Sequence, residues 1–92
     1  MARIIEIKTQ NCPRCKSFEP EFQRIQSEHP EHTYEYLVFG VDPEAQIIAT
    51  KHAIKSAPTF VIEQEGKDDI VTKQEELEAV IKSLWLVLKP LF

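Results

Sequence analysis

Cys12 and Cys15 are the only two cysteines of the chain and its strongest candidates for chemistry. They enclose a proline and an arginine in the stretch NCPRCK. Such a pair can be a structural disulfide, half of a metal site, or a redox-active dithiol. A bridge over so short a separation closes a very small loop, which gives little entropic stabilisation. A purely structural disulfide is therefore disfavoured.

A metal site would need two further ligands, and His29 and His32 are the candidates. Zinc sites with two cysteines and two histidines usually place roughly three to five residues between the histidines. Here only Pro30 and one further residue separate them. Pro30 also interrupts the helical geometry that would direct both rings toward one ion. We therefore expect no metal ion.

The sequence around the cysteines predicts a buried strand, a loop and a helix. Residues 3–8 are rich in isoleucine, as is typical of a buried strand. Cys12 occupies an N-cap position, and Pro13 suits the first helical position, where its missing N–H is not needed. The helix should continue across Pro20 with a kink, because apolar residues still recur at helical spacing beyond it.

The remaining chain predicts a single α/β domain over residues 1–92, with the element order β-α-β-α-β-β-α and a four-stranded mixed sheet flanked by helices. The strands are expected at 33–39, 59–64 and 69–71, the first of them covered on both faces. A short helix should begin behind Asp42, and the last helix at a capping box of Thr72 and Glu75. A right-handed β-α-β crossover makes the first strand central and places the cysteines at its carboxyl end.

That position favours thiol chemistry. A thiol at a helix N-terminus faces unpaired N–H groups and the positive end of the helix dipole, which stabilise the reactive thiolate. Arg14 and Lys16 add positive charge nearby. We expect Cys12 to be the exposed nucleophile, and Cys15 to resolve the mixed disulfide formed on Cys12.

Two motifs together resemble the thioredoxin fold family, in a chain of glutaredoxin size, and the likeness covers nearly the whole sequence. In CPRCKSFEP, Lys16 and Pro20 match the thioredoxin pattern, and VDPEAQIIATKHAIKSAPTFVI is similar to the segment that ends in Pro58 and Thr59. The resemblance implies a cis Ala57–Pro58 bond packed against the cysteines. It also implies that a substrate strand pairs with the backbone of Ala57.

By the same resemblance, Pro13, Arg14, Ala57 and Pro58 are expected to contact the substrate. Glu6 lies at the offset from Cys12 where thioredoxins place a buried acid beneath the second cysteine. One interpretation makes Glu6 a general base for the resolving thiol, with a pKa raised by burial. The other makes it a solvated glutamate, or one paired with Lys8, and is slightly favoured because charged residues are seldom buried without partners.

Several residues depart from the family patterns. Asn11 replaces the aromatic residue that precedes the first cysteine in thioredoxins and helps to form the substrate surface. Pro13 is shared with glutaredoxins, but Thr9 replaces their glutathione-contacting lysine, and no Gly-Gly pair precedes the last helix. Asp68 and Asp69 could imitate the acidic end of a glutathione site, although a solvated hairpin is the simpler interpretation.

Charge and end sequences limit the remaining alternatives. The 92-residue chain carries 11 basic and 15 acidic residues, a net charge of −4, without a basic run suited to nucleic acid. The first residues lack the apolar core of a secretory signal, and the last apolar stretch is shorter than the roughly 20 residues that span a bilayer. We therefore expect a cytoplasmic protein that does not bind membranes.

The C-terminal apolar residues have two interpretations. They either complete a small core or form a contact surface for a dimer or partner, and the first interpretation, with a monomeric protein, is favoured. The residues outside the main helical stripe are Leu86, Val87, Leu91 and Phe92.

The sequence thus predicts a thiol–disulfide oxidoreductase that reduces protein disulfides and needs no cofactor. Its partners would be protein disulfides and either a thiol-donating reductase or glutathione. A glutaredoxin that draws electrons from glutathione is the alternative. A non-catalytic binding module and a protein that holds an iron–sulfur cluster between two chains also stay open, although binding modules of this fold often lose one cysteine and this chain keeps both.

Overall fold

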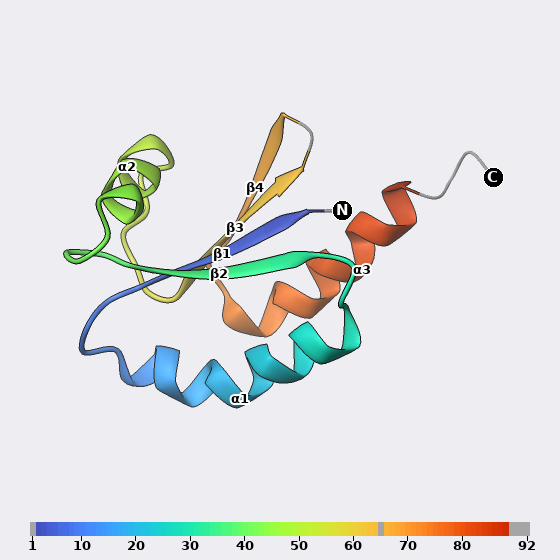
Figure 1. Cartoon of the computed structure of the whole chain (residues 1–92), viewed down its shortest axis with the longest axis horizontal. Helices are drawn as coiled ribbons and strands as arrows, with labels where there is room; N and C mark the ends of the chain where they lie inside the picture. The colour runs from blue at the N-terminus through green and yellow to red at the C-terminus, as the bar shows by residue number, and fades with distance from the viewer. Residues whose placement is uncertain (1, 65, 89–92) are drawn as a thin grey trace.

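A computed structural model of the chain describes residues 2–64 and 66–88, with the backbone alone for residues 85–88. The elements follow the predicted order, with one extra turn of 3-10 helix, η1, before the last helix (Figure 1). Their bounds are β1 Arg3–Lys8, α1 Pro13–Glu28, β2 Thr33–Val38, α2 Pro43–Lys51, β3 Thr59–Gln64, β4 Lys67–Val71, η1 Gln74–Glu76 and α3 Leu77–Leu88.

The four strands form one mixed sheet in the order β2-β1-β3-β4. β1 pairs in parallel with β2 and antiparallel with β3, which in turn pairs antiparallel with β4. The prediction that the first strand is central is confirmed. The register sets Glu6 of β1 beside Tyr36 on one side and Phe60 on the other.

Helices cover both faces of the sheet, with α1 and α3 on one side and α2 on the other (Figure 1). Side chains of a strand alternate between faces, so β1 contributes to two cores. Ile4 packs with Phe22 and Phe60 beneath α1 and α3. Ile5 and Ile7 belong to the second core, beneath α2.

The first helix, α1, buries four side chains at helical spacing, Cys15, Phe18, Phe22 and Ile25. This apolar stripe explains why the helix runs through Pro20 without ending there, as predicted. Cys12 is its N-cap and Pro13 its first residue, also as predicted. The helix therefore begins at the cysteine pair.

The second strand, β2, differs from the prediction of a strand covered on both faces. It is an edge strand that ends at Val38, and Leu37 alone among its residues is buried. Edge strands have one neighbour only, and the helices pack mainly over the central strands. The apolar composition of β2 was therefore a poor guide to its burial.

The start of the last helix also differs from the prediction. Thr72 and Glu75 form no capping box, because the N-cap of the preceding 3-10 turn is Lys73, without a side-chain cap bond. Asp42 does occupy the N-cap position of α2, but its Oδ2 accepts a hydrogen bond from Val38 N–H, at 2.8 Å, and caps no helical N–H. This contact closes the loop between β2 and α2.

None of the described helices is long and apolar enough to cross a membrane. The prediction about the C-terminal apolar residues concerns the side chains of Leu86, Val87, Leu91 and Phe92, which lie outside the part of the chain described here.

Phe22 is expected to be the main aromatic contribution to stability. Its ring is fully buried and lies 5.3 Å from the ring of Phe60, centroid to centroid, and 5.8 Å from those of Tyr34 and Tyr36. Phe22→Ala should lower the free energy of unfolding by about 3–5 kcal/mol, measured by urea denaturation. Ile47→Ala, at a side chain 66 % exposed, is the matched control and should cost about 0.5 kcal/mol or less. Similar losses in both variants would contradict the proposed packing.

Candidate active site

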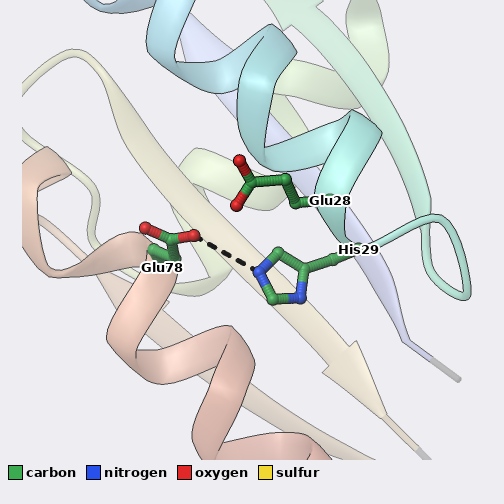
Figure 2. Close-up of side chains that lie close together, drawn as sticks. All are labelled: Glu28, His29 and Glu78. Atoms are coloured by element: carbon green, nitrogen blue, oxygen red, sulfur yellow. Dashed lines mark hydrogen bonds and ion pairs between the residues drawn. The ribbon is translucent and has the colours of Figure 1, made fainter.

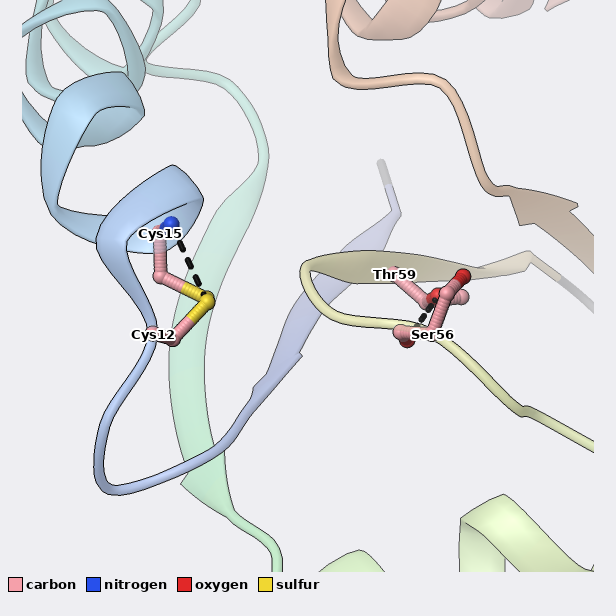
Figure 3. The surroundings of a disulfide bond; sticks show 4 residues. All are labelled: Cys12, Cys15, Ser56 and Thr59. Atoms are coloured by element: carbon pink, nitrogen blue, oxygen red, sulfur yellow. Dashed lines mark hydrogen bonds between the residues drawn. A yellow bond between two sulfur atoms is a disulfide. The ribbon is translucent and has the colours of Figure 1, made fainter.

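The cysteine pair lies where the loop from the end of β1 enters α1. Cys12 and Cys15 form a disulfide, with their Cα atoms 5.2 Å apart. The backbone N–H of Cys15 donates a hydrogen bond to Cys12 Sγ at 3.1 Å (Figure 3). The structure is therefore that of the oxidised form, and the N-terminus of α1 already directs an N–H group at the sulfur of Cys12.

The expectation that Cys12 is exposed does not hold in this oxidised form. Cys12 is 7 % exposed and Cys15 is 5 % exposed, so the two residues are about equally buried. Cys12 Sγ is joined to Cys15 Sγ and also accepts the N–H of Cys15. Pro13, Arg14 and Lys16 are exposed around the pair.

A second segment, between α2 and β3, lies opposite the cysteines. The Ala57–Pro58 bond is cis, as the resemblance implied. Thr59 Oγ1 donates to the carbonyl oxygen of Ser56 at 2.7 Å, which holds the segment in a tight turn across from the disulfide (Figure 3). Among the described residues, no hydrogen bond engages the backbone of Ala57.

Glu6 is buried, with 3 % of its surface exposed. The interpretation of Glu6 as a solvated glutamate is therefore wrong, because β1 lies inside the sheet and this face is covered by helices. Lys8, the proposed surface partner, instead places its Nζ 4.8 Å from the centre of the Tyr36 ring. Burial raises the pKa of Glu6 to about 7; the charge of Lys8 lowers it and that of Glu19 raises it, both by less.

A hollow of about 240 Å³ opens beside Ala57, on the face of the sheet that carries α2. We call it the Phe39 hollow; its wall consists of Ile7, Thr9, Phe39, Ala49, Ile54 and the segment 55–57. Phe39 is 45 % exposed although it is aromatic. Sequence reasoning placed Phe39 at the end of a strand and missed this position; the apolar residues on both sides of Gly40, in a loop at the active-site end, were the available signal.

A sequence profile of the thioredoxin family matches residues 2–84. The chain belongs to the thioredoxin family. Thioredoxins are also its structural neighbours, and with its cysteine pair the protein is a thiol–disulfide oxidoreductase. A search of curated proteins found no match.

Three solved structures illustrate the likeness. Thioredoxin from Fasciola hepatica superposes with a TM-score of 0.76 and 24 % identity, over 89 % of this chain and 79 % of that one. Thioredoxin f from spinach chloroplast gives a TM-score of 0.75 and 25 % identity, over 89 % and 74 %. Thioredoxin f2 in its complex with ferredoxin:thioredoxin reductase gives 0.78 and 24 %, over 90 % and 76 %.

In this thioredoxin-family protein, Cys12 and Cys15 lie far from His29, so these residues do not form the zinc site that was considered from the sequence. The cysteines begin α1 and His29 is its C-cap, and a helix of 16 residues is about 24 Å long. His32 is buried, and its Nδ1 accepts a hydrogen bond from the backbone N–H of Ala2 at 3.0 Å. Burial lowers the pKa of His32, which favours the neutral ring whose Nδ1 accepts this hydrogen bond.

A different cluster, of Glu28, His29 and Glu78, has the composition of a metal site, with its ligand atoms within 4.8 Å of one another (Figure 2). Its carboxylates already have a cation, because Arg24 bonds Glu28 and Glu78 at 2.8 Å each. Hydrogen bonding to Arg24 lowers the pKa of Glu78 to about 2. The cluster joins α1 to α3, and a metal ion would have to displace the guanidinium group.

The acidic residues considered for glutathione binding lie in β4, not in a free loop. Asp68 Oδ2 lies 3.1 Å from His52 Nε2 and 3.4 Å from Lys51 Nζ, both at the end of α2. Asp68 therefore already has partners within the protein and ties α2 to the sheet edge. Asp69 pairs with Ile62 in the β3–β4 ladder.

Glu6 should make the oxidised protein less stable as the pH rises. The unfolded carboxyl group loses its proton near pH 4.5, whereas the folded one keeps it until about pH 7. Between these values the folded state binds more protons, so the free energy of unfolding falls with rising pH. Glu6→Gln should remove this fall and raise stability at pH 8 by up to about 3 kcal/mol.

Urea denaturation of both proteins at pH 5 and pH 8 measures this difference. Glu75→Gln, at an exposed carboxylate, is the control and should keep the pH dependence of the original chain. If Glu6→Gln kept the pH dependence of stability seen in the original chain, Glu6 would not have a raised pKa in the folded protein.

Proposed function

We propose that the protein reduces disulfides of protein substrates, with Cys12 as the nucleophile and Cys15 as the resolving cysteine. The observation that carries the proposal is the position of Cys12 at the N-cap of α1, with its Sγ accepting the N–H of Cys15. Unpaired N–H groups and the positive helix end stabilise the thiolate, which is the attacking species. Arg14 and Lys16 are proposed to add to this stabilisation.

The first step forms a mixed disulfide. The Cys12 thiolate attacks one sulfur of the substrate disulfide, the substrate S–S bond breaks, and the other substrate sulfur leaves as a thiolate. Pro13 and Arg14 are proposed to contact the substrate here. Ala57, whose backbone carries no described hydrogen bond, is proposed to pair with the substrate strand beside Pro58.

The second step releases the substrate. The Cys15 thiol loses its proton and attacks Cys12 Sγ, which forms the Cys12–Cys15 disulfide and frees the second substrate thiolate. Glu6 is proposed to accept this proton. Its side chain belongs to the sheet face on which α1 packs, and a carboxyl group with a pKa of about 7 can exchange a proton near neutral pH.

A thiol donor must then return two electrons and two protons to the pair. We propose a thiol-donating reductase as this partner; thioredoxin f2 is seen in a complex with ferredoxin:thioredoxin reductase, which supports such a partner in general. Asp68 is engaged by His52, which argues against its use for glutathione. We further propose that the chain acts as a single-domain monomer in a reducing compartment such as the cytoplasm.

Reduction of insulin disulfides by the purified protein tests the function. The protein is recharged in parallel by thioredoxin reductase with NADPH and by glutathione with its reductase. Turnover with the first is expected. Turnover with glutathione alone would make the protein a glutaredoxin in function, and no turnover with either would refute general reduction of protein disulfides.

Cys15→Ser should trap the intermediate. Without the resolving thiol, the substrate stays bound to Cys12, so intact-mass spectrometry after incubation with oxidised insulin should show a stable adduct at Cys12. The control is Cys12→Ser, which should form little adduct in the same time. A stable adduct on Cys15 in the control variant would reverse the two roles.

Glu6→Gln should slow the second step at pH 7 by about a hundredfold, the typical loss on removing a general base. The rate is measured by stopped-flow mixing of the reduced protein with a substrate that reports release of its second thiol. In the unaltered protein this rate should rise as the pH passes about 7, where Glu6 loses its proton. An unchanged rate and pH profile in Glu6→Gln, with Glu75→Gln as the matched control, would exclude Glu6 as the base.

A further inference from the structure

The active-site end of the molecule carries a positive surface, although the chain as a whole is acidic. Lys8 ends β1, Arg14 and Lys16 lie in the first turn of α1, and Lys55 lies two residues before Ala57. Within the described residues, none of these four cations forms an ion pair. The charges of Arg14, Lys16 and Lys55 are therefore available to a partner, whereas Lys8 lies over the ring of Tyr36.

Six of the acidic residues are paired with two arginines away from the cysteines. Arg3, at the start of β1, holds Glu35, Glu44 and Glu63, and Arg24, toward the end of α1, joins the carboxylates of α1 to α3. Both networks lie at the opposite end of their elements from the cysteines. The field around the disulfide is consequently more positive than the net charge of −4 indicates.

The Phe39 hollow adds an apolar contact to this positive surface. An engineered protein cavity of about 150 Å³ holds a benzene molecule, so a hollow of about 240 Å³ is large enough for an aromatic or leucine side chain. Phe39 gives its wall an exposed ring, in a protein with Asn11 in place of the usual aromatic residue before Cys12. Lys55 is part of the same wall.

The hollow adjoins the backbone to which a substrate strand would pair. Side chains of an extended strand alternate between its two faces. When the reacting cysteine points at Cys12, the residue next to it therefore points the other way, toward the α2 face on which the hollow opens. Ala57 lines the hollow and offers its backbone at the same place.

We propose that the Phe39 hollow binds the apolar side chain directly next to the reacting cysteine of a protein substrate, and that Lys55 and the neighbouring cations select substrates with acidic residues around it. This inference rests on the proposed function and specifies its substrates. Phe39 and Lys55 act as specificity residues and take no part in the exchange of sulfur bonds.

An exchange equilibrium tests the proposal without turnover. In Cys15→Ser, with glutathione bound to Cys12 as a mixed disulfide, a peptide thiol displaces glutathione and forms the peptide disulfide on Cys12. One S–S bond breaks and one forms, so no oxidant or reductant is consumed. The heptapeptides carry one cysteine, with phenylalanine or serine on either side of it and glutamate or lysine further out. The exchange constant of each peptide on Cys12 is divided by the constant for the same peptide with oxidised glutathione. This division removes the intrinsic thiol reactivity of the peptide.

We expect the exchange constant of a peptide with phenylalanine at one of the two adjacent positions to be about tenfold larger than that of the peptide with serine there. Adding Phe39→Ala should reduce this preference to threefold or less, by the same relation between buried apolar area and affinity. Ile47→Ala is the matched control and should keep it, because Ile47 is exposed on α2 away from the hollow.

Glutamate flanks should be preferred over lysine flanks at low salt, and 0.5 M salt should weaken the preference. Lys55→Glu should reduce it, whereas Lys67→Glu, at an exposed lysine of β4, should not.

Equal exchange for phenylalanine and serine peptides, or a preference that survives Phe39→Ala, would overturn the hollow as the binding site. Equal exchange for glutamate and lysine flanks would overturn the charge selection. The result is independent of the insulin assay, because exchange on a single cysteine needs neither Cys15 nor a reductase. Failure of the proposed function and failure of this inference are thus observed separately.

Discussion

The pairing of β1 with β3 is the interaction on which the site depends. Its antiparallel register sets Ile7 opposite Thr59, and so brings the segment with Pro58 to the end of the strand that leads to Cys12. Side chains of a strand alternate between faces, so a slip of one residue would turn Glu6 away from α1 and Ile7 toward it. The apolar residues on both sides of Glu6 oppose such a slip, because Ile5 and Ile7 are needed in the core beneath α2. The buried carboxyl group is thus held in place by the packing of its neighbours, since no described side chain forms an ion pair or hydrogen bond with it.

In its proposed role as a base, the buried Glu6 would set function against stability. A carboxyl group that is desolvated keeps its proton to a higher pH, and the folded state loses stability once it must carry the charge. The same desolvation gives Glu6 a pKa of about 7, where a general base is most effective. An apolar residue in its place would pack without this cost but could not exchange a proton. The large aromatic core beside it, with Phe22 and Phe60 fully buried, contributes the stability that offsets the cost.

Local patterns in the sequence were sufficient to predict the features that local chemistry determines. The isoleucines of β1, the proline behind Cys12 and the stripe of α1 each predicted an element that the structure contains. The central position of β1 was predicted as well, but two features that depend on tertiary neighbours were not. Burial of Glu6 depends on β1 being flanked by two strands, and exposure of β2 on its position at the sheet edge. The place of Phe39 in the wall of the hollow depends on contact between the loop after β2 and the segment before β3, which the apolar residues beside Gly40 do not reveal by themselves.

The distribution of charge also depends on which residues the fold brings together. Counting residues gives an acidic protein, and an acidic protein would be expected to repel acidic partners. In the folded chain, however, Arg3 and Arg24 gather carboxylates into networks remote from the cysteines. Lys8 and Lys55 are brought from different parts of the sequence to the edge where the cysteines lie. A partner approaching the disulfide meets this local field, since charges beyond a Debye length of about 8 Å are largely screened at physiological salt. The charges near the disulfide therefore differ from the average of the whole chain, and a preference among partners must be deduced from the fold.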